Sequence, residues 1–317
     1  MTEGKEFDIM VVGELNVDLI LGRLNKPPVF GEEQRADSMT LTLGSSTAIF
    51  SSNAAALGSR VAFCGKVGAD SFGEQVMSSL KENGVNRDYV MVDPHLQTGA
   101  TIIFEYEGEH MGVTYQGAME HLSVSDVPEE LFRKCRHLHT SAIFFQPGLK
   151  RDIVSLFQKA KEFGLTTSMD TQWDPDEKWD LDLNQLLPYL DFFVPNEQEL
   201  IHLASASSLD EALESLSGFN TTFVVKRGAK GALMRTGGKT HTEPAWNVPE
   251  IADTVGAGDS FNAGFLHEFL RGKPLTECLR FGNLTAAVST TKAGGTTGID
   301  SYRQVTETAK QWRNETE

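Results

Sequence analysis

The chain has 317 residues, of which 40% are hydrophobic, and this length suits one large α/β domain with a sizeable core. A formal net charge of −16 at pH 7 argues against nucleic acids and anionic membrane surfaces as partners, because both would repel the protein. Residues 1–8 are largely polar and no apolar run reaches the ~18 residues of a membrane span, so we expect a cytoplasmic enzyme.

Short apolar runs alternate with segments of helical periodicity along most of the chain. Strands are expected at 7–12, 61–64, 136–140, 166–169, 190–194, 222–225 and 232–234. Helices are expected at 47–57, 72–83, 149–163, 197–204 and 208–217. This alternation predicts a three-layer α/β/α architecture, in which helices cover both faces of a mostly parallel central sheet. No internal repeat or Pro-, Gly- or Ser-rich linker is visible, which favours a single domain over residues 1–317.

Two segments, residues 14–42 and 97–117, depart from this rhythm because hydrophobic and polar residues alternate in them. Pro27-Pro28 and the tripeptide 107–109 supply turns, so each segment is expected to form a hairpin that stands off the main sheet. No helical pattern accompanies them, and we expect the outer faces of these strands to be polar.

Residues 253–265 place two carboxylates around a Gly-Ala-Gly turn that runs into an apolar-periodic helix. Gly256 and Gly258 lack a Cβ, so the backbone can turn sharply and direct several N–H groups at one anion. Asp259 falls in the first helical turn, where the partial positive charge of a helix N-terminus suits an anionic transition state. Its carboxylate could accept the proton of an attacking hydroxyl, although a helix-capping role is the alternative.

This string resembles the C-terminal signature of the ribokinase-like, or pfkB, family of carbohydrate kinases, which has the form Asp-Thr-x-Gly-Ala-Gly-Asp-x-Phe. The resemblance implies that Asp259 is the catalytic base and that the amides of Gly256, Ala257 and Gly258 form an anion hole for the transferred phosphate. It also implies ATP and Mg²⁺ as cofactors. The two hairpin segments would form a small β-sheet lid over the sugar, and this lid is a candidate surface for a homodimer.

The first family match for the sugar site follows the strand at 7–12, where Asn16 and Asp18 correspond to the family's Asn-x-Asp pattern. The carboxylate of Asp18 can accept hydrogen bonds from two sugar hydroxyls, as its counterpart in the family does. A turn aspartate satisfied by local backbone is the alternative. Asn16 is a second candidate for the same surface.

The second match for the sugar site is the segment 44–58, which keeps the first and last glycines of a family signature. Gly44, Ser45 and Ser46 can offer amides and hydroxyls to a sugar at a helix start, with simple helix capping as the alternative for the serines. Ile49 stands where the family usually has an asparagine that contacts the sugar. Because Ile49 cannot form hydrogen bonds, the identity of the substrate is left open.

For the nucleotide, Asn196 and Glu199 match the family's Asn-x-x-Glu element, in which the glutamate holds Mg²⁺ through water. The same spacing serves a helix capping box, and the two roles are compatible. The segment 224–231 resembles the family's strand and glycine turn under ATP. Gly228 and Gly231 would let the backbone approach the nucleotide there, and Lys226 would face its phosphates.

Two further matches lie near the C-terminus. Asn283, in a helix expected to begin at Phe281, lies near the adenine in relatives. Asp253 and carbonyl groups of the loop 293–298 surround a monovalent cation in relatives, and K⁺ suits such ligands; a plain flexible turn is the alternative.

At 170–175, several sugar kinases of this family carry Asp-x-Asn-x-Arg, and this chain has Gln172 and Asp174 in the Asn and Arg places. An acidic Asp174 would repel an anionic substrate, which favours a neutral sugar or a nucleoside. His137 and His139 share one face of an expected strand and are interpreted as structural. The absence of a Walker-type motif and of a full Gly-x-Gly-x-x-Gly argues against a P-loop kinase and a nicotinamide enzyme.

Together these matches predict an ATP-dependent kinase that phosphorylates a hydroxyl, expected to be a terminal CH₂OH, of a small neutral sugar. A nucleoside kinase of the same family is one alternative. A non-catalytic sugar- or nucleotide-binding protein with the same fold is the other, although such a protein would have no use for a base at residue 259.

Overall fold

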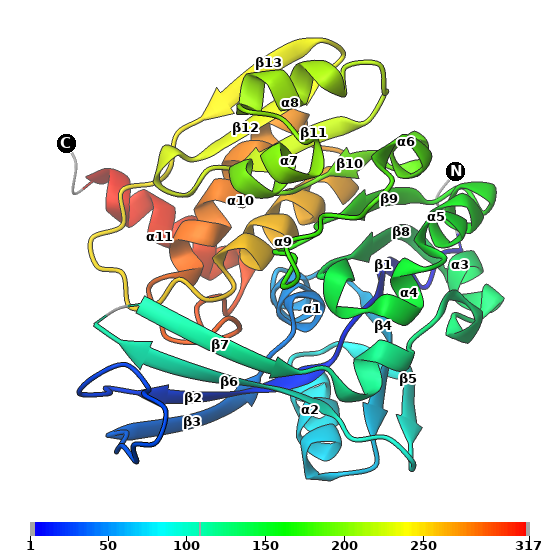
Figure 1. The fold of residues 1–317 in the computed structure, drawn as a ribbon. Helices are drawn as coiled ribbons and strands as arrows, with labels where there is room; N and C mark the ends of the chain where they lie inside the picture. The colour runs from blue at the N-terminus through cyan, green and yellow to red at the C-terminus, as the bar shows by residue number, and fades with distance from the viewer. Residues whose placement is uncertain (1–3, 108, 315–317) are drawn as a thin grey trace.

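A nine-stranded sheet forms the centre of the protein, whose computed structural model describes residues 4–107 and 109–314. Its order is β13-β12-β11-β10-β9-β8-β1-β4-β5 (Figure 1). The strands are β1 (Phe7–Val12), β4 (Val61–Gly68), β5 (Asn86–Asp93), β8 (Cys135–Thr140), β9 (Thr166–Met169), β10 (Phe192–Phe193), β11 (Thr222–Lys226), β12 (Ala232–Thr236) and β13 (Lys239–Glu243). Pairing is parallel from β5 to β11 and antiparallel for β12 and β13, so the mostly parallel sheet is confirmed. Only β5 and β13 lie outside the expected strands.

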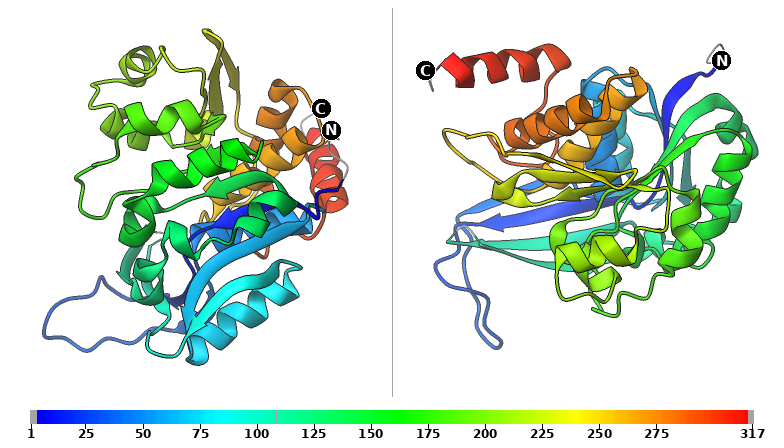
Figure 2. Two further views of the ribbon diagram at one scale, coloured as in Figure 1. Left: turned by 90° about the vertical axis from the view of Figure 1, so that its right-hand side faces the viewer. Right: turned by 90° about the horizontal axis from the view of Figure 1, so that it is seen from above.

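Helices cover both faces of this sheet, as the side view and the view from above show (Figure 2). One face carries α1 (Ser46–Ala56), α2 (Ser71–Glu82), α9 (Ala257–Leu270), α10 (Leu275–Ser289) and α11 (Tyr302–Asn314). The other carries α3 (Glu129–Lys134), α4 (Pro147–Lys150), α5 (Ile153–Glu162), α6 (Leu183–Leu186), α7 (Glu197–Leu203) and α8 (Leu209–Ser215). Short 3₁₀ turns lie at Gly117–His121, Val124–Asp126, Ile143–Phe145, Leu187–Tyr189 and Gly228–Lys230. The three-layer α/β/α architecture is therefore confirmed.

Two hydrophobic cores result from this layering, because successive side chains of a strand point to opposite faces of the sheet. In β1, Met10 and Val12 pack with the helices of one layer, whereas Ile9 and Val11 pack with those of the other. All four are fully buried. This double burial explains why residues 9–12 of β1 read as a continuous apolar run in the sequence.

A separate four-stranded sheet projects from one edge of the molecule (Figure 1). It consists of β2 (Asn16–Gly22), β3 (Ser38–Leu43), β6 (Gly99–Tyr106) and β7 (Glu109–Tyr115) in the order β3-β2-β6-β7. The pairs β2/β3 and β6/β7 are antiparallel, and β2 and β6 join the hairpins in parallel. Two small hairpins off the main sheet are thus confirmed; Gly108, in the second expected turn, lies outside the described residues.

The two faces of this small sheet differ in a way that corrects the sequence interpretation. The polar residues Asp18, Thr101 and Thr114 are in register with one another and share the inner face. The opposite face, called the outer lid face below, is apolar and exposed rather than polar. It comprises Met39, Leu41, Ile102, Met111, Val113 and Tyr115.

No helix in the described ranges, 4–107 and 109–314, combines the length and the apolar character that crossing a bilayer requires.

Candidate active site

A pocket of about 220 Å³ lies between the central sheet and the inner face of the small sheet. It receives residues that follow β1 and β9, residues from the starts of α1 and α9, and residues from β2, β6 and β7. It is lined by Glu14, Asn16, Asp18, Ser45, Ser46, Ile49, Thr101, Ile103, Thr114, Met119, Ala142, Phe145, Gln172, Val255, Gly256 and Asp259. This lining contains carboxylates but neither lysine nor arginine. The location fits the rule that ligands of parallel α/β sheets bind at the carboxyl ends of the strands.

Asp18 is held on β2 and lines this pocket. The Nδ2 atom of Asn16 donates to the carboxylate of Asp18 at 3.2 Å and to the hydroxyl of Thr101 at 2.9 Å. A Cβ on Gly44 would lie 2.2 Å from Oδ1 of Asp18, so glycine is required to leave room for this carboxylate. Burial raises the pKa of Asp18 to about 6, and the bonds from Asn16 and Thr101 oppose that rise.

The two serines at the start of α1 have different partners. Ser45 is the N-cap, and its Oγ accepts from the amide of Ala48 at 3.1 Å while it donates to the carbonyl of Glu14 at 2.6 Å. The capping alternative therefore holds for Ser45. Ser46 instead donates its hydroxyl hydrogen to Oδ1 of Asp259. Both serines line the pocket.

Asp259 lies in the first turn of α9, as expected from the sequence. The helix starts after Gly256, which is the N-cap with a φ of 71° in the left-handed region that favours glycine. A Cβ there would also lie 2.8 Å from Cα of Gly295 and 2.9 Å from the side chain of Ile49. The tight turn therefore depends on glycine. The amide of Ala257 donates to the carbonyl of Thr254 at 3.2 Å.

The carboxyl group of Asp259 is 5% exposed, and its environment disfavours the charged form. Burial raises its pKa to about 8, and the nearby charge of Asp170 adds to the rise. The hydrogen bond from Ser46 and the positive charge of Lys226 act in the opposite direction. A carboxyl group with such a pKa is suited to proton transfer near neutral pH.

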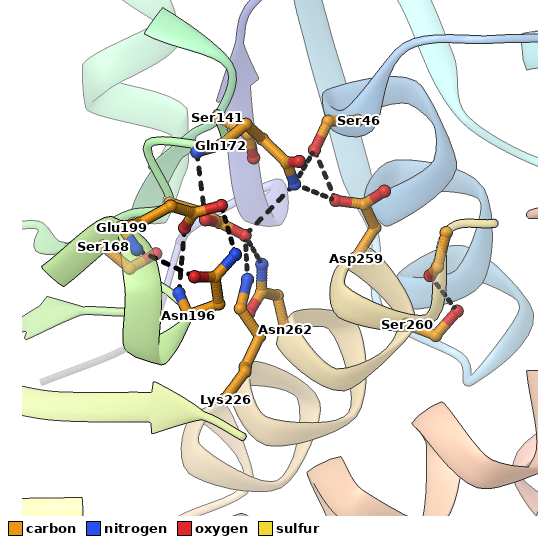
Figure 3. Close-up of polar contacts among 12 residues, drawn as sticks. Ser46, Ser141, Ser168, Gln172, Asn196, Glu199, Lys226, Asp259, Ser260 and Asn262 are labelled. Atoms are coloured by element: carbon orange, nitrogen blue, oxygen red, sulfur yellow. Dashed lines mark hydrogen bonds and ion pairs between the residues drawn. The ribbon is translucent and has the colours of Figure 1, made fainter. Parts of the chain in front are cut away.

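Asp170 is the buried centre of the site, and the sequence analysis missed it. It follows β9 directly and has no exposed surface. Lys226, at the end of β11, forms an ion pair with its Oδ2, and Asn262 donates to the same oxygen at 2.7 Å. The side chains of Lys226, Asn262 and Gln172 converge in Figure 3. The available signal was the position of Asp170 at the carboxyl end of an expected strand, as the first residue of the Asp-x-Asn-x-Arg pattern.

Lys226 connects this cluster to the first turn of α9. A Cβ on Gly258 would lie 3.4 Å from the lysine Nζ, which places the ammonium group against the start of the helix. Burial by itself would lower the pKa of Lys226, but attraction to Asp170 and Glu199 outweighs it and raises that pKa. Lys226 is therefore a buried positive charge beside the Gly-Ala-Gly turn.

A second pocket of about 400 Å³ adjoins Lys226. Besides Lys226, its lining consists of Trp173, Asn196, Glu197, Gln198, Arg227, Gly228 and Lys230. Gly228 has a φ of 54° and open space where a Cβ would stand. A Cβ on Gly231 would lie 2.1 Å from the carbonyl oxygen of Glu243, so Gly231 is explained by packing against the end of β13. The structure thus brings Asn196, Lys226 and Gly228 to one surface.

A family model described as pfkB family carbohydrate kinase matches residues 6–301. The chain belongs to this family. It is therefore a carbohydrate kinase. A deoxyribokinase of Salmonella typhimurium is 30% identical to this kinase over 317 residues, which cover 95% of the present chain and 98% of the relative.

Solved structures share the fold of this kinase. Arabidopsis thaliana ribokinase, complexed with ribose and ATP, has a TM-score of 0.82 at 23% identity, with 95% of this chain and 98% of that chain covered. A putative ribokinase II from E. coli, in complex with ATP and Mg²⁺, has a TM-score of 0.82 at 21% identity, with 96% and 99% covered. At these identities the likeness establishes the ribokinase fold alone.

Asn196 and Glu199 of the kinase form the capping box that their spacing allows. The amide of Glu199 donates to the side chain of Asn196 at 2.9 Å, and the amide of Asn196 donates back to the Glu199 carboxylate at 2.8 Å. Burial, followed by the charge of Asp170, raises the pKa of Glu199 to about 7. Each carboxylate oxygen has a further lone pair, so the capping box leaves room for a bond from water. Glu199 is buried and is not among the residues that line the second pocket.

Asn283, the residue expected near the adenine, has identifiable hydrogen-bond partners. Asn283 lies within α10, which begins at Leu275 rather than at Phe281 as expected, and its Nδ2 donates to the carbonyls of Glu243 and Pro244 at 3.0 and 3.1 Å. It is not among the residues that line the second pocket.

Asp253 joins the signature segment to the glycine-rich loop 293–298. Its carboxylate accepts from the amide of Val255 at 2.9 Å and from the amide of Gly294 at 2.8 Å. The two elements expected to surround a cation are therefore adjacent.

Asp174 requires a correction. Its carboxylate is 3% exposed and accepts from the amides of Lys178 and Trp179 at 2.9 and 2.7 Å. It stabilises its own loop and does not line the pocket of about 220 Å³, called the sugar-sized pocket below. It therefore cannot be the group that repels an anionic substrate. The two histidines behave as expected: His137 and His139 are buried, both contact the hydroxyl of Ser168 at 2.7 Å, and burial lowers their pKa values.

Glu14 is a pocket residue that the sequence analysis did not single out. Its carboxylate accepts from the amide and the hydroxyl of Thr47 at 3.1 and 2.8 Å and from the amide group of Gln146 at 3.1 Å. Burial raises its pKa to about 7. Its position directly after Gly13, where β1 leaves the sheet, was the signal that could have identified it.

Proposed function

We propose that the kinase transfers the γ-phosphoryl group of ATP to a hydroxyl, that of a terminal CH₂OH, of a small neutral sugar, with Asp259 as the general base. The observation that carries this proposal is the position of Asp259. Its buried carboxyl group belongs both to the wall of the sugar-sized pocket and to the first turn of α9. A base at that point can deprotonate a hydroxyl in the pocket beside an anion-binding helix start.

The pocket lining supports a neutral substrate. Glu14, Asp18 and Asp259 place three carboxyl groups around about 220 Å³, and no lysine or arginine lines that space. A phosphate or carboxylate on the substrate would be buried near these groups without a positive partner, which is costly. Asp18 would bind a pair of sugar hydroxyls, with Asn16, Ser45 and Ser46 lining the same pocket and Gly44 leaving room for the Asp18 carboxylate.

In the proposed reaction, the oxygen of the sugar hydroxyl attacks the γ-phosphorus while Asp259 accepts the hydroxyl proton. The bond between the γ-phosphorus and the bridging oxygen breaks, and that oxygen leaves with ADP. The amides of Gly256 and Gly258, at the start of α9, would stabilise the negative charge that develops on the phosphoryl oxygens. The amide of Ala257 would join them after leaving the carbonyl of Thr254. Lys226, beside Gly258, would supply positive charge at the same point.

The nucleotide is assigned to the second pocket. Asn196, Lys226 and Gly228 line it, together with Arg227 and Lys230. Both of these basic residues pair with Glu197, at 2.9 and 3.9 Å, and would turn to the phosphates of a bound triphosphate. Gly231 and Asn283 would act indirectly, by holding the backbone at the end of β13 through the contacts described above. Mg²⁺, held by Glu199 through water, would neutralise charge on the phosphates. The E. coli neighbour complexed with ATP and Mg²⁺ supports both cofactors.

A nucleoside is the second candidate substrate, and one observation favours it. Ile49, Ile103, Met119 and Phe145 give the pocket an apolar wall. Such a wall suits a base better than it suits a fully hydroxylated sugar.

An assay of ATP-dependent ADP formation tests these proposals. The panel would contain neutral pentoses and hexoses, deoxysugars, nucleosides, sugar phosphates and sugar acids. We expect turnover with a neutral sugar and none with the phosphorylated or acidic analogues. Preference for a nucleoside would establish the second candidate, and turnover confined to an anionic sugar would contradict the argument from pocket charge.

We also propose that the outer lid face pairs with the same face of a second copy, which forms a homodimer. The support is the contiguity of its exposed apolar side chains, such as Met39 at 71% and Val113 at 60% exposure, on the sheet face away from the substrate.

Three further proposals concern the chain as a whole. Residues 1–317 are proposed to form one kinase domain with the small sheet as its lid. A cytoplasmic location is supported by three free, buried cysteines, namely Cys64, Cys135 and Cys278. K⁺ is proposed near Asp253 and the loop 293–298, supported by the contact of Asp253 with Gly294.

A further inference from the structure

Gln172 occupies an unusual backbone conformation at the edge of the sugar-sized pocket. It follows the carboxyl end of β9 and lines the pocket, yet its φ is 57°, in the left-handed region that non-glycine residues rarely adopt. Strain of this kind is unfavourable and concentrates at functional sites. The surrounding residues must therefore hold the backbone of Gln172 in this conformation, since glutamine does not favour it by itself.

The contacts of its side chain indicate what that reason is. The Nε2 atom of Gln172 donates to Oγ of Ser46 at 3.0 Å and to Oδ1 of Asp259 at 3.2 Å. Because the Ser46 hydroxyl accepts from Gln172, its own hydrogen is directed to Oδ1 of Asp259. Figure 3 shows the three side chains converging from α1, α9 and the loop after β9. In the described part of the chain, the hydrogen bonds found at this carboxylate all end on Oδ1.

We propose that Gln172 is a positioning residue for the catalytic base: together with Ser46 it holds Oδ1 of Asp259, so that Oδ2 is the oxygen left to accept the substrate proton. The same amide lies 3.5 Å from Oδ2 of Asp170, and so stands between two buried carboxyl groups that repel each other. This inference rests on the proposed role of Asp259 as the base. It assigns a function to the position at which the chain departs from the Asp-x-Asn-x-Arg pattern.

The electrostatic consequence can be derived from the groups that face Asp259. These are Asp170 after β9, Glu14 after β1 and Lys226 at the end of β11. Burial and the two carboxyl groups favour the protonated form of Asp259, whereas Lys226 and the hydrogen bond from Ser46 favour the ionised form. The Gln172 amide also donates to this carboxylate, and a donor stabilises the ionised form in the same way. Loss of the Gln172 amide therefore raises the pKa of Asp259, by about one unit for a hydrogen bond to a charged group.

The experiment measures kcat/KM for the sugar against pH, from 6 to 10, in the wild-type enzyme, Gln172→Met and Gln172→Glu. Methionine keeps the length of the side chain without a donor, and glutamate replaces the donor by a third carboxyl group. We expect the rising limb of the profile to move to higher pH by about one unit in Gln172→Met and by at least as much in Gln172→Glu. At pH values below the limb, kcat/KM of the variant is therefore about tenfold lower than that of the wild type. At pH values above the limb, kcat/KM returns to the wild-type value. Gln75→Met and Gln75→Glu, on the exposed surface of α2, are the matched controls.

A loss of activity that is equal at every pH, or an unmoved limb in a folded variant, would overturn the inference. Thermal unfolding verifies that each variant is folded. Ser46→Ala removes the second donor to the same oxygen and must move the limb in the same direction, which keeps the test decisive if Gln172→Met does not fold. If Asp259→Asn retains turnover, the base assignment itself fails. If Asp259→Asn is inactive but the limb does not move in Gln172→Met, only the role of Gln172 fails.

Discussion

The hydroxyl of Ser46, in the first turn of α1, donates a hydrogen bond to the carboxylate of Asp259, in the first turn of α9. Two helix starts that are far apart in the sequence therefore meet at one carboxyl group. Because each helix start carries partial positive charge, the two starts favour a phosphoryl group bound between them, whereas burial and Asp170 disfavour the ionised form of Asp259 itself.

Replacement of Asp259 by asparagine is expected to lower kcat by at least ~10²-fold, because loss of a general base typically costs that much. Nucleotide affinity should be nearly unchanged, since the second pocket is lined by other residues. Steady-state kinetics and calorimetric titration with ATP measure the two quantities. Asp210→Asn, on the exposed start of α8, is a matched control. Turnover close to that of the wild type in the folded variant would exclude Asp259 as the base.

The pH profile of kcat/KM for the sugar should rise through a limb near pH 8. The pKa of Asp259 is raised to about 8, so at pH 6 to 7 most molecules carry a protonated carboxyl group that cannot accept a proton. Deprotonation with increasing pH generates the active form, and activity therefore increases with pH. A profile that is flat between pH 6 and 9 would show that a different group limits the reaction.

Asp18→Ala should raise KM for the sugar far more than KM for ATP. A carboxylate that accepts two hydroxyl hydrogens contributes roughly 1.5–3 kcal/mol, which corresponds to roughly 10- to 100-fold in KM. Initial-rate measurements with each substrate varied in turn provide the comparison. Asp88→Ala, at an exposed position of β5, is a control. Equal increases for both substrates would assign Asp18 to folding instead.

K⁺ should increase activity over Na⁺ or Tris at fixed ionic strength, because a cation near Asp253 would order the loop next to the start of α9. In Asp253→Asn the response to K⁺ should be lost, whereas Asp300→Asn, at an exposed position of the same region, should keep it. Indifference of the wild-type enzyme to monovalent cations would end the cation proposal.

The homodimer proposal predicts that Val113→Asp yields a monomer at concentrations at which the wild-type protein is a dimer. A buried, unpaired carboxylate at the centre of an apolar interface is strongly unfavourable. Val29→Asp, at an exposed position of the β2–β3 loop that is not part of the outer lid face as defined above, should leave the dimer intact. Size-exclusion chromatography with light scattering measures the mass. A wild-type protein that is monomeric at ~100 times the assay concentration would contradict the proposal.

Much of this kinase could be predicted from local patterns. The apolar runs that became β1 and β11 are buried on both faces, so hydrophobicity alone identified them. The start of α9 was predictable because Gly256 and the periodicity after Asp259 act within a few residues of each other. The start of α10 was missed, although Pro274 at its N-cap is a local helix-start signal.

The two faces of the lid mark the limit of that reasoning. Alternation predicted strands, but it could not state which face turns inward. Asp18, Thr101 and Thr114 face inward because β2, β6 and β7 pair in the register that brings these three residues together, and Leu41 and Val113 are exposed as a result. Register depends on pairing between distant segments, which no single segment encodes.

The sequence by itself determined the fold class and the family, and it singled out Asp259 as the candidate base. Each of these conclusions depends on patterns of neighbouring residues, namely the periodicity of single strands and helices and the signature at 253–265. Only the tertiary structure decided that Gln172 bonds to Asp259, that Lys226 pairs with Asp170, and that Asp174 faces its own loop. The order of strands in the sheet places the carboxyl ends of β9 and β11 next to the start of α9, and these contacts exist only once that order is established.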